Sequence, residues 1–164
     1  MKVSSSQRIT INIIKWVLFA VVMVTLIVML TRSAGATSSA DLKTLQANVE
    51  QASESDRMKK GDNRMLRRLY GIDPEMLEGM VFYYPASNMG AEELLFVRVK
   101  NEADVAAVKG LIEQRNASQI RAFEGYGVEQ TQMLKDAVIS EHGRDLLYSV
   151  GSQSNAVEEA YLKT

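Results

Sequence analysis

The feature that most constrains this chain is a run of fifteen residues without charge, from Trp16 to Leu30. At about 1.5 Å per residue, a helix of that length covers roughly 22 Å, less than the ~30 Å hydrocarbon core of a bilayer. Residues 9–14 lengthen the run enough, because the stem of Lys15 can lie along the helix while its ammonium reaches the interface. We therefore expect a transmembrane signal anchor at residues 9–32, preceded by a cytoplasmic tail at 1–8.

The charges around this run predict its orientation. The basic residues that precede it are Lys2, Arg8 and Lys15, whereas the one that follows immediately is Arg32. Because positive charge stays on the cytoplasmic side, we expect a single-pass protein of the cell membrane with a cytoplasmic N-terminus and an extracytoplasmic C-terminal domain. The motif at residues 34–36, Ala-Gly-Ala, also fits a signal-peptidase site. A secreted form cleaved after Ala36 is therefore the alternative.

Composition excludes several kinds of partner and site. Residues 1–32 hold four basic residues and no acidic ones, which leaves fifteen basic and twenty acidic residues for the remainder. A mildly acidic domain argues against nucleic acid as a partner. The absence of cysteine excludes disulfides and zinc–thiolate sites, and His142 is the single histidine. No phosphate-binding glycine pattern occurs, so we expect neither a metal nor a cofactor.

Periodicity and turn residues predict an α+β domain. The expected helices lie at 41–52, 57–70, 101–124, 128–135 and 155–161, and the expected strands at 80–84, 94–99, 137–140 and 146–150. Two hairpins separated by helices predict an antiparallel sheet with helices on one face. We expect a spacer and stalk helix at 33–60 and an extracytoplasmic domain at 61–164, although helix 41–52 could also pack on that domain. The predicted core contains Phe82, Val97, Ile112, Phe123 and Tyr148.

Two groups of charged residues have a plain interpretation. The segment 57–68 is basic and could contact an anionic envelope polymer or lipid headgroups, but a solvated helix face is the better account. The acidic pairs Glu92-Glu93 and Glu158-Glu159 are adjacent in sequence, so their side chains diverge on a regular element. We interpret both pairs as surface charge.

The most informative polar residues are Arg115 and Gln119, which are four positions apart and share a helix face with Ile112 and Phe123. A guanidinium on an apolar face is costly unless it is paired. Arg115 is therefore either an internal clamp, which we favour, or a recognition point for an anionic group. Together with Tyr126, these two residues form the candidate binding site.

A resemblance to one family extends over about residues 63–152. The residues that carry it are Tyr83, Tyr84, Pro85, the strand at 93–100, Val105, Val108, Ile112, Arg115, Gln119, Phe123, Tyr126, Leu134, Val138, Gly143 and Leu147. The chain resembles a domain-of-unknown-function family of small anchored or lipoprotein-type extracytoplasmic proteins of clostridial Gram-positive bacteria. It departs from that pattern in having no cysteine to lipidate, and in having Gly127 where a Tyr-x-Pro segment is expected. The resemblance implies a location and a domain class but no activity.

These observations together predict a membrane-anchored cell-envelope protein without catalytic activity, whose extracytoplasmic domain binds a ligand or a partner. The expected partners are the lipid bilayer, through residues 9–32, and an envelope protein or an anionic wall polymer. No nucleophile motif of the Gly-x-Ser-x-Gly type occurs, and His142 falls in a hairpin. The alternative is a small hydrolase or transferase that acts on wall polymer with an acid such as Glu124, near Tyr126.

Overall fold

The computed structural model describes residues 15–16, 19, 21–24, 42–53 and 57–163, and it divides the chain into two units, Met1–Ala36 and Thr37–Thr164. The described residues of the first unit are helical, with exposed side chains such as Trp16 and Phe19. Among the described residues, no helix is both long enough and apolar enough to cross a membrane. Most of the expected anchor at 9–32, the tail at 1–8 and the spacer at 33–41 lie outside the described residues.

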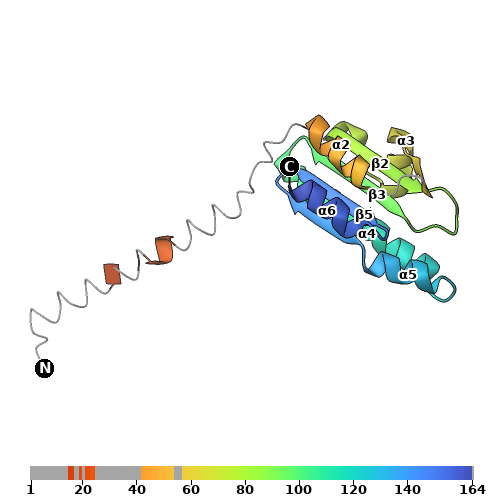
Figure 1. Ribbon diagram of the computed structural model, residues 1–164. Coiled ribbons are helices and arrows are strands. Elements are labelled where there is room, and N and C mark those ends of the chain that lie inside the picture. Colours follow the sequence, from red (N-terminus) through yellow and green to blue (C-terminus); the bar gives the residue numbers. More distant parts are fainter. Residues whose placement is uncertain (1–14, 17–18, 20, 25–41, 54–56, 164) are drawn as a thin grey trace, which may run out of the picture. The chain divides into compact units, whose positions relative to one another are not determined.

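The second unit is built on an antiparallel sheet of five strands in the order β1-β2-β3-β5-β4. Figure 1 labels the middle three strands, β2, β3 and β5. The strands are β1 (Met58–Lys60), β2 (Leu77–Pro85), β3 (Glu93–Val99), β4 (Val138–His142) and β5 (Asp145–Val150). Both predicted hairpins are present, β2–β3 and β4–β5, and they join where β3 pairs with β5. The α+β class is therefore confirmed.

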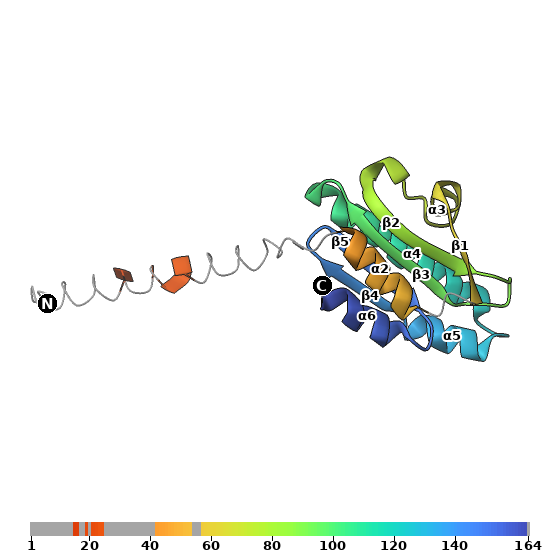
Figure 2. The ribbon, with the colours of Figure 1, turned by 45° about the horizontal axis from the view of Figure 1, so that its top comes forward.

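The edge strand β1 was not predicted. The segment from Arg57 was expected to begin a basic helix, but Met58–Lys60 pairs with Tyr83–Pro85 of β2 (Figure 2). The helix that follows, α3, starts later and spans Asn63–Tyr70. The side chain of Asp62 accepts a hydrogen bond from the Met65 amide at its start, and Gly71 ends it at a φ of 72°.

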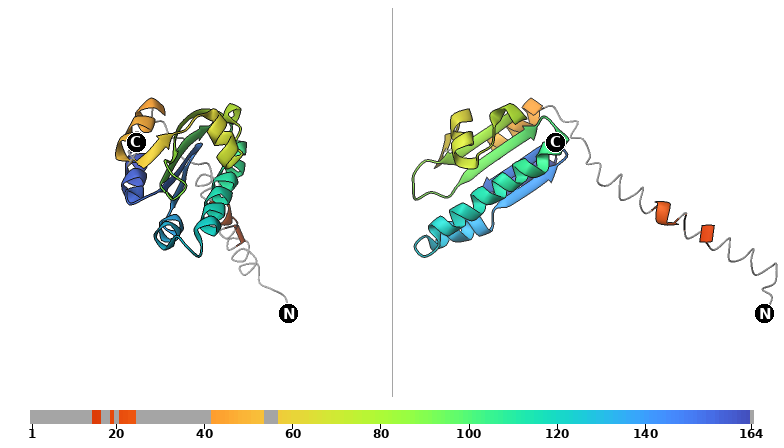
Figure 3. Two further views of the ribbon diagram at one scale, coloured as in Figure 1. Left: turned by 90° about the vertical axis from the view of Figure 1, so that its right-hand side faces the viewer. Right: turned by 180° about the vertical axis from the view of Figure 1, so that it is seen from behind.

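Helices cover both faces of the sheet, so the prediction of one covered face is wrong. On one face lie α2 (Leu42–Ala52) and α6 (Ser154–Leu162). On the other face lie α3, α4 (Val105–Phe123) and α5 (Val128–Lys135), and the edge-on view in Figure 3 shows the two layers. Short 3₁₀ turns at Pro74–Met76 and Glu102–Asp104 precede β2 and α4.

Two separate apolar cores result from the alternation of side chains along the strands. The core on the α4 side contains all five predicted residues: Phe82, Val97, Ile112, Phe123 and Tyr148. The core on the α2 side takes the intervening strand residues, such as Leu94 and Phe96 of β3. Because β3 lies in the middle of the sheet with helices on both sides, every residue of β3 is buried.

Helix α2 packs on the domain. Its Leu45 and Val49 are buried in the second core, and the Gln46 amide donates a hydrogen bond to the Met80 carbonyl at 3.1 Å. The compact unit includes α2 and β1, whereas our expected division placed residues 33–60 outside the domain. The short apolar stripe of residues 42–52 is thus a packing surface and not the surface of a free stalk.

Candidate functional site

A buried polar network joins α3, β3 and α4 on one side of the sheet. Arg115 of α4 donates from Nη2 to Glu93 Oε2 at 3.1 Å, and the Tyr70 hydroxyl donates to Glu93 Oε1 at 2.8 Å. The Arg115 guanidinium also lies over the Tyr70 ring, 5.8 Å from its centroid. The side chains of Arg115 and Glu93 are 13% and 1% exposed, so this ion pair is almost closed to water. Arg115 therefore has the internal acidic partner that a clamp requires.

Strand geometry brings Glu93 into this network. Glu93 opens β3 and alternates with Leu95 and Val97, so its side chain points to the face that α4 covers. Our interpretation of Glu92-Glu93 as surface charge is therefore wrong for Glu93. Burial raises the pKa of the Glu93 carboxyl above its ordinary value of 4.5, although Arg115 and Tyr70 oppose that rise.

Gln119 completes the surroundings of Arg115, one helical turn further along α4. In the carboxamide orientation that matches donors with acceptors, the Gln119 oxygen accepts from Arg115 Nη1 and from Nη2, the latter at 2.8 Å, and the NH₂ group is turned away from the guanidinium. Arg115 Nε is buried and has no hydrogen-bond partner among the described residues. The structure thus brings together two of the three residues of the sequence-predicted site.

The third residue, Tyr126, lies apart from this pair. It follows the end of α4, where it is 62% exposed and contacts the Phe123 ring with centroids 5.8 Å apart. Gly125, with a φ of 99°, turns the chain between them. Glu124 is exposed at the same turn, and His142 is exposed at the end of β4. Neither Glu124 nor Tyr126 lines the cleft beside Arg115.

This cleft has a volume of about 300 Å³ and opens between α3, α4 and the loop after β2. Its lining residues are Met65, Arg68, Leu69, Tyr84, Pro85, Ser87, Asn88, Gly90, Arg115, Gln119 and Phe123. None of these described lining residues carries a carboxylate. Sequence reasoning missed Arg68, which was assigned to a solvated helix face, and the loop residues Ser87 and Asn88.

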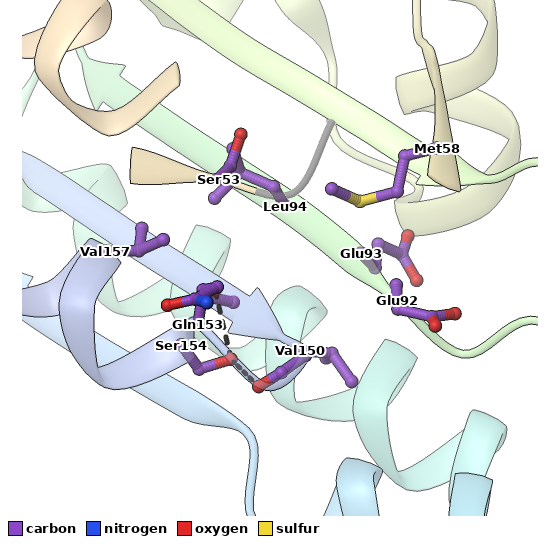
Figure 4. A pocket seen from close by; sticks show the side chains of 11 residues that line it. Ser53, Met58, Glu92, Glu93, Leu94, Val150, Gln153, Ser154 and Val157 are labelled. Atoms are coloured by element: carbon purple, nitrogen blue, oxygen red, sulfur yellow. Dashed lines mark hydrogen bonds between the residues drawn. The ribbon is translucent and has the colours of Figure 1, made fainter. Parts of the chain in front are cut away.

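Two other hollows flank the start of β3. The one in Figure 4 has only about 10 Å³, and Ser154 Oγ there accepts a hydrogen bond from Ser149 Oγ at 3.2 Å. That volume holds about one water molecule, so it is not a ligand site. A larger hollow of about 450 Å³ lies beyond the β2–β3 loop and is lined in part by Glu92 and Glu129. Within the described residues, no group of three histidine, aspartate or glutamate side chains is placed to hold a metal ion.

Comparison with protein-family models finds one match over residues 50–151, more than half of the chain. The matched model describes a domain of unknown function, DUF4358. It covers the last residues of α2 and all five strands, and it ends just before α6. No curated protein and no solved structure matches the chain.

Proposed function

We propose that this chain, which belongs to the DUF4358 family of domains of unknown function, contains a non-enzymatic binding domain. The family assigns no activity, so the proposal is argued from the geometry of the site. The observation that carries the proposal is the cleft of about 300 Å³ beside Arg115 and Gln119. Its size is at the lower end of the range of small-ligand sites, and it combines apolar walls with a few polar groups, as such sites do.

The network behind the cleft favours binding over chemistry. Glu93 is the acid closest to Arg115, but both of its oxygens are occupied, by Arg115 and by Tyr70. A side chain that acts as a catalytic acid or nucleophile must be free to reach the reacting atom of the substrate. Among the described lining residues, Tyr84 and Ser87 carry hydroxyl groups, and Ser87 lies on an exposed loop. The arrangement therefore supports a preformed recognition surface.

We place this domain outside the cell, on an anchor formed by residues 9–32. The length of the apolar run and the excess of basic residues before it support this placement. The described residues between 15 and 24 are helical and exposed, which is consistent with a segment that meets lipid. On this proposal the partners are the bilayer and an envelope protein or anionic wall polymer of a Gram-positive cell.

The location is tested by adding protease to intact protoplasts that express the full chain. We expect residues 37–164 to be digested without opening the membrane, and protection of the domain until lysis would contradict the proposed orientation. The mature N-terminus is sequenced in the same experiment. A chain that begins at Thr37 and is found in the medium would replace the anchor with a cleaved signal peptide.

The binding function is tested by filling the cleft. Gln119→Trp should obstruct it, and Tyr126→Ala is the control, because Tyr126 is exposed outside the cleft. In a thermal-shift screen of envelope-derived compounds, a ligand should raise the melting temperature of wild type and Tyr126→Ala but not of Gln119→Trp. A compound that stabilises all three proteins equally binds elsewhere and would contradict the proposal.

A further inference from the structure

The charge of the cleft indicates which ligands it can accept. Its lining contains two cations, Arg68 and Arg115, and Glu93 behind the cleft neutralises the second one. Arg68 is exposed on α3 and makes no ion pair with any residue that the structure describes. Its neighbour Arg67 differs, because its Nη2 contacts Asp73 Oδ1 at 2.8 Å. The cleft therefore keeps about one uncompensated positive charge.

The other polar groups at the cleft are suited to donate hydrogen bonds. The carboxamide oxygen of Gln119 already accepts from Arg115, so its NH₂ group is the part left for a ligand. Asn88, exposed on the β2–β3 loop, offers a second carboxamide. A guanidinium accompanied by neutral donors matches the oxygens of a carboxylate or phosphate, which accept several hydrogen bonds at once.

The remaining wall is apolar. It consists of Met65 and Leu69 of α3, Tyr84 and Pro85 at the end of β2, and Phe123 of α4. We propose that this cleft binds one anionic group, a carboxylate or a phosphate monoester, carried on an apolar body, and that Arg68 is the residue that selects the anion. This inference rests on the proposed binding function and adds the chemical class of the ligand.

The larger hollow of about 450 Å³, which we call the second hollow, provides an internal comparison. It borders the same loop through Ser87 and Gly90, but its lining includes Glu92 and Glu129. Arg57 is the cation on that side, and its Nη1 lies 3.8 Å from Glu92 Oε1. Anions are therefore disfavoured in the second hollow, and selection for an anion comes from the Arg68 side of the loop.

The test uses the full chain in phosphatidylcholine nanodiscs and phenyl phosphate as the probe, with binding measured by isothermal titration calorimetry. Arg68→Gln removes the free cation, and we expect it to weaken binding by about tenfold or more. Arg64→Gln is the matched control, because Arg64 is also exposed on α3 but does not line the cleft. Equal weakening by both changes, or no binding to wild type, would overturn the proposal.

Further binding measurements test the charge of the ligand and whether it comes from a lipid. Phenylacetate should bind and phenylacetamide should not, so equal binding of the amide would overturn the selection for an anion. Phosphatidylglycerol in the nanodiscs should compete with phenyl phosphate if the natural group is a lipid headgroup, and should leave binding unchanged if it is a soluble anion. Release of phenol from the probe would contradict the non-enzymatic function while leaving the anion site in place.

Discussion

Replacing Arg115 with alanine removes the cation that lies against a buried carboxylate. The ion pair has a 3.1 Å contact, and the side chain of Glu93 is 1% exposed, so little water reaches the carboxylate. Removing one partner of a buried pair costs about 3–5 kcal/mol, because the remaining charge stays buried. The lost contact over the Tyr70 ring adds about 0.5–1 kcal/mol. We expect Arg115→Ala to lower the free energy of unfolding by about 4 kcal/mol at neutral pH.

The size of this loss should depend on pH. Burial raises the pKa of Glu93 above 4.5 in the wild type, and Arg115 is the strongest influence against that rise, so the pKa should be higher still in the variant. An acid with a raised folded-state pKa makes stability fall as pH increases from the unfolded value through the folded one, by about 1.4 kcal/mol per pH unit. Because this window extends to higher pH in the variant, the difference between the proteins should be smallest near pH 4.5 and should grow toward neutrality.

The assay is urea unfolding of the wild type and the variant, followed by circular dichroism at several pH values between about 4.5 and 7.5. The double variant Glu93→Gln/Arg115→Ala is compared with Glu93→Gln alone, and its loss of stability should not change with pH, because neither protein retains the Glu93 carboxylate. Arg115→Lys should also be destabilised, since an ammonium cannot reproduce contacts to both Glu93 and Gln119. A loss below about 1 kcal/mol, or one that is constant across this pH range, would refute the clamp.

Three further predictions concern the core and the sheet. Phe123→Ala should cost about 3–5 kcal/mol in urea unfolding, because the ring is 3% exposed, and a loss below about 1 kcal/mol would place the ring outside the core. Arg98→Ala should cost a similar ~3–5 kcal/mol, because Asp145 is fully buried and contacts Arg98 at 2.6 and 2.7 Å; an unchanged urea midpoint would contradict this. Gly61→Ala should cost about 1–3 kcal/mol, because a Cβ there would lie 2.2 Å from the Phe82 ring, and a melting temperature equal to that of the wild type would show that the ring moves aside freely.

The fold could be predicted where side-chain patterns are strong. Alternating β-branched and aromatic residues identified four strands, and glycine and proline marked their ends. Strand β1 gave no such signal, because Lys59 and Lys60 are exposed and the strand is defined by backbone pairing to β2. The second helical layer did leave a signal that we did not use. The continuous apolar run Leu94–Val97 is typical of a strand buried on both faces.

The site could be predicted only within one helix. The spacing of Arg115 and Gln119 placed both on one face, because helix geometry is local. Their acidic partner, Glu93, is 22 positions away, and no local pattern reports a contact made through the sheet. Tyr126 was grouped with them by proximity in sequence, but the turn at Gly125 separates it from the cleft.

The two ends of β3 carry charges that point in opposite directions. Glu93 faces Arg115 of α4, whereas Arg98 faces Asp145 on the side covered by α6. The other residues of β3 are apolar: Leu95, Val97 and Val99 share the face of Glu93, and Leu94 and Phe96 share the face of Arg98. A slip of one residue would turn every side chain of the strand to the other face. Both charges would then meet hydrocarbon without their partners, and each orphaned charge costs several kcal/mol. The central strand is thus protected against misaligned pairing during folding, since a shifted sheet would be penalised on both faces at once.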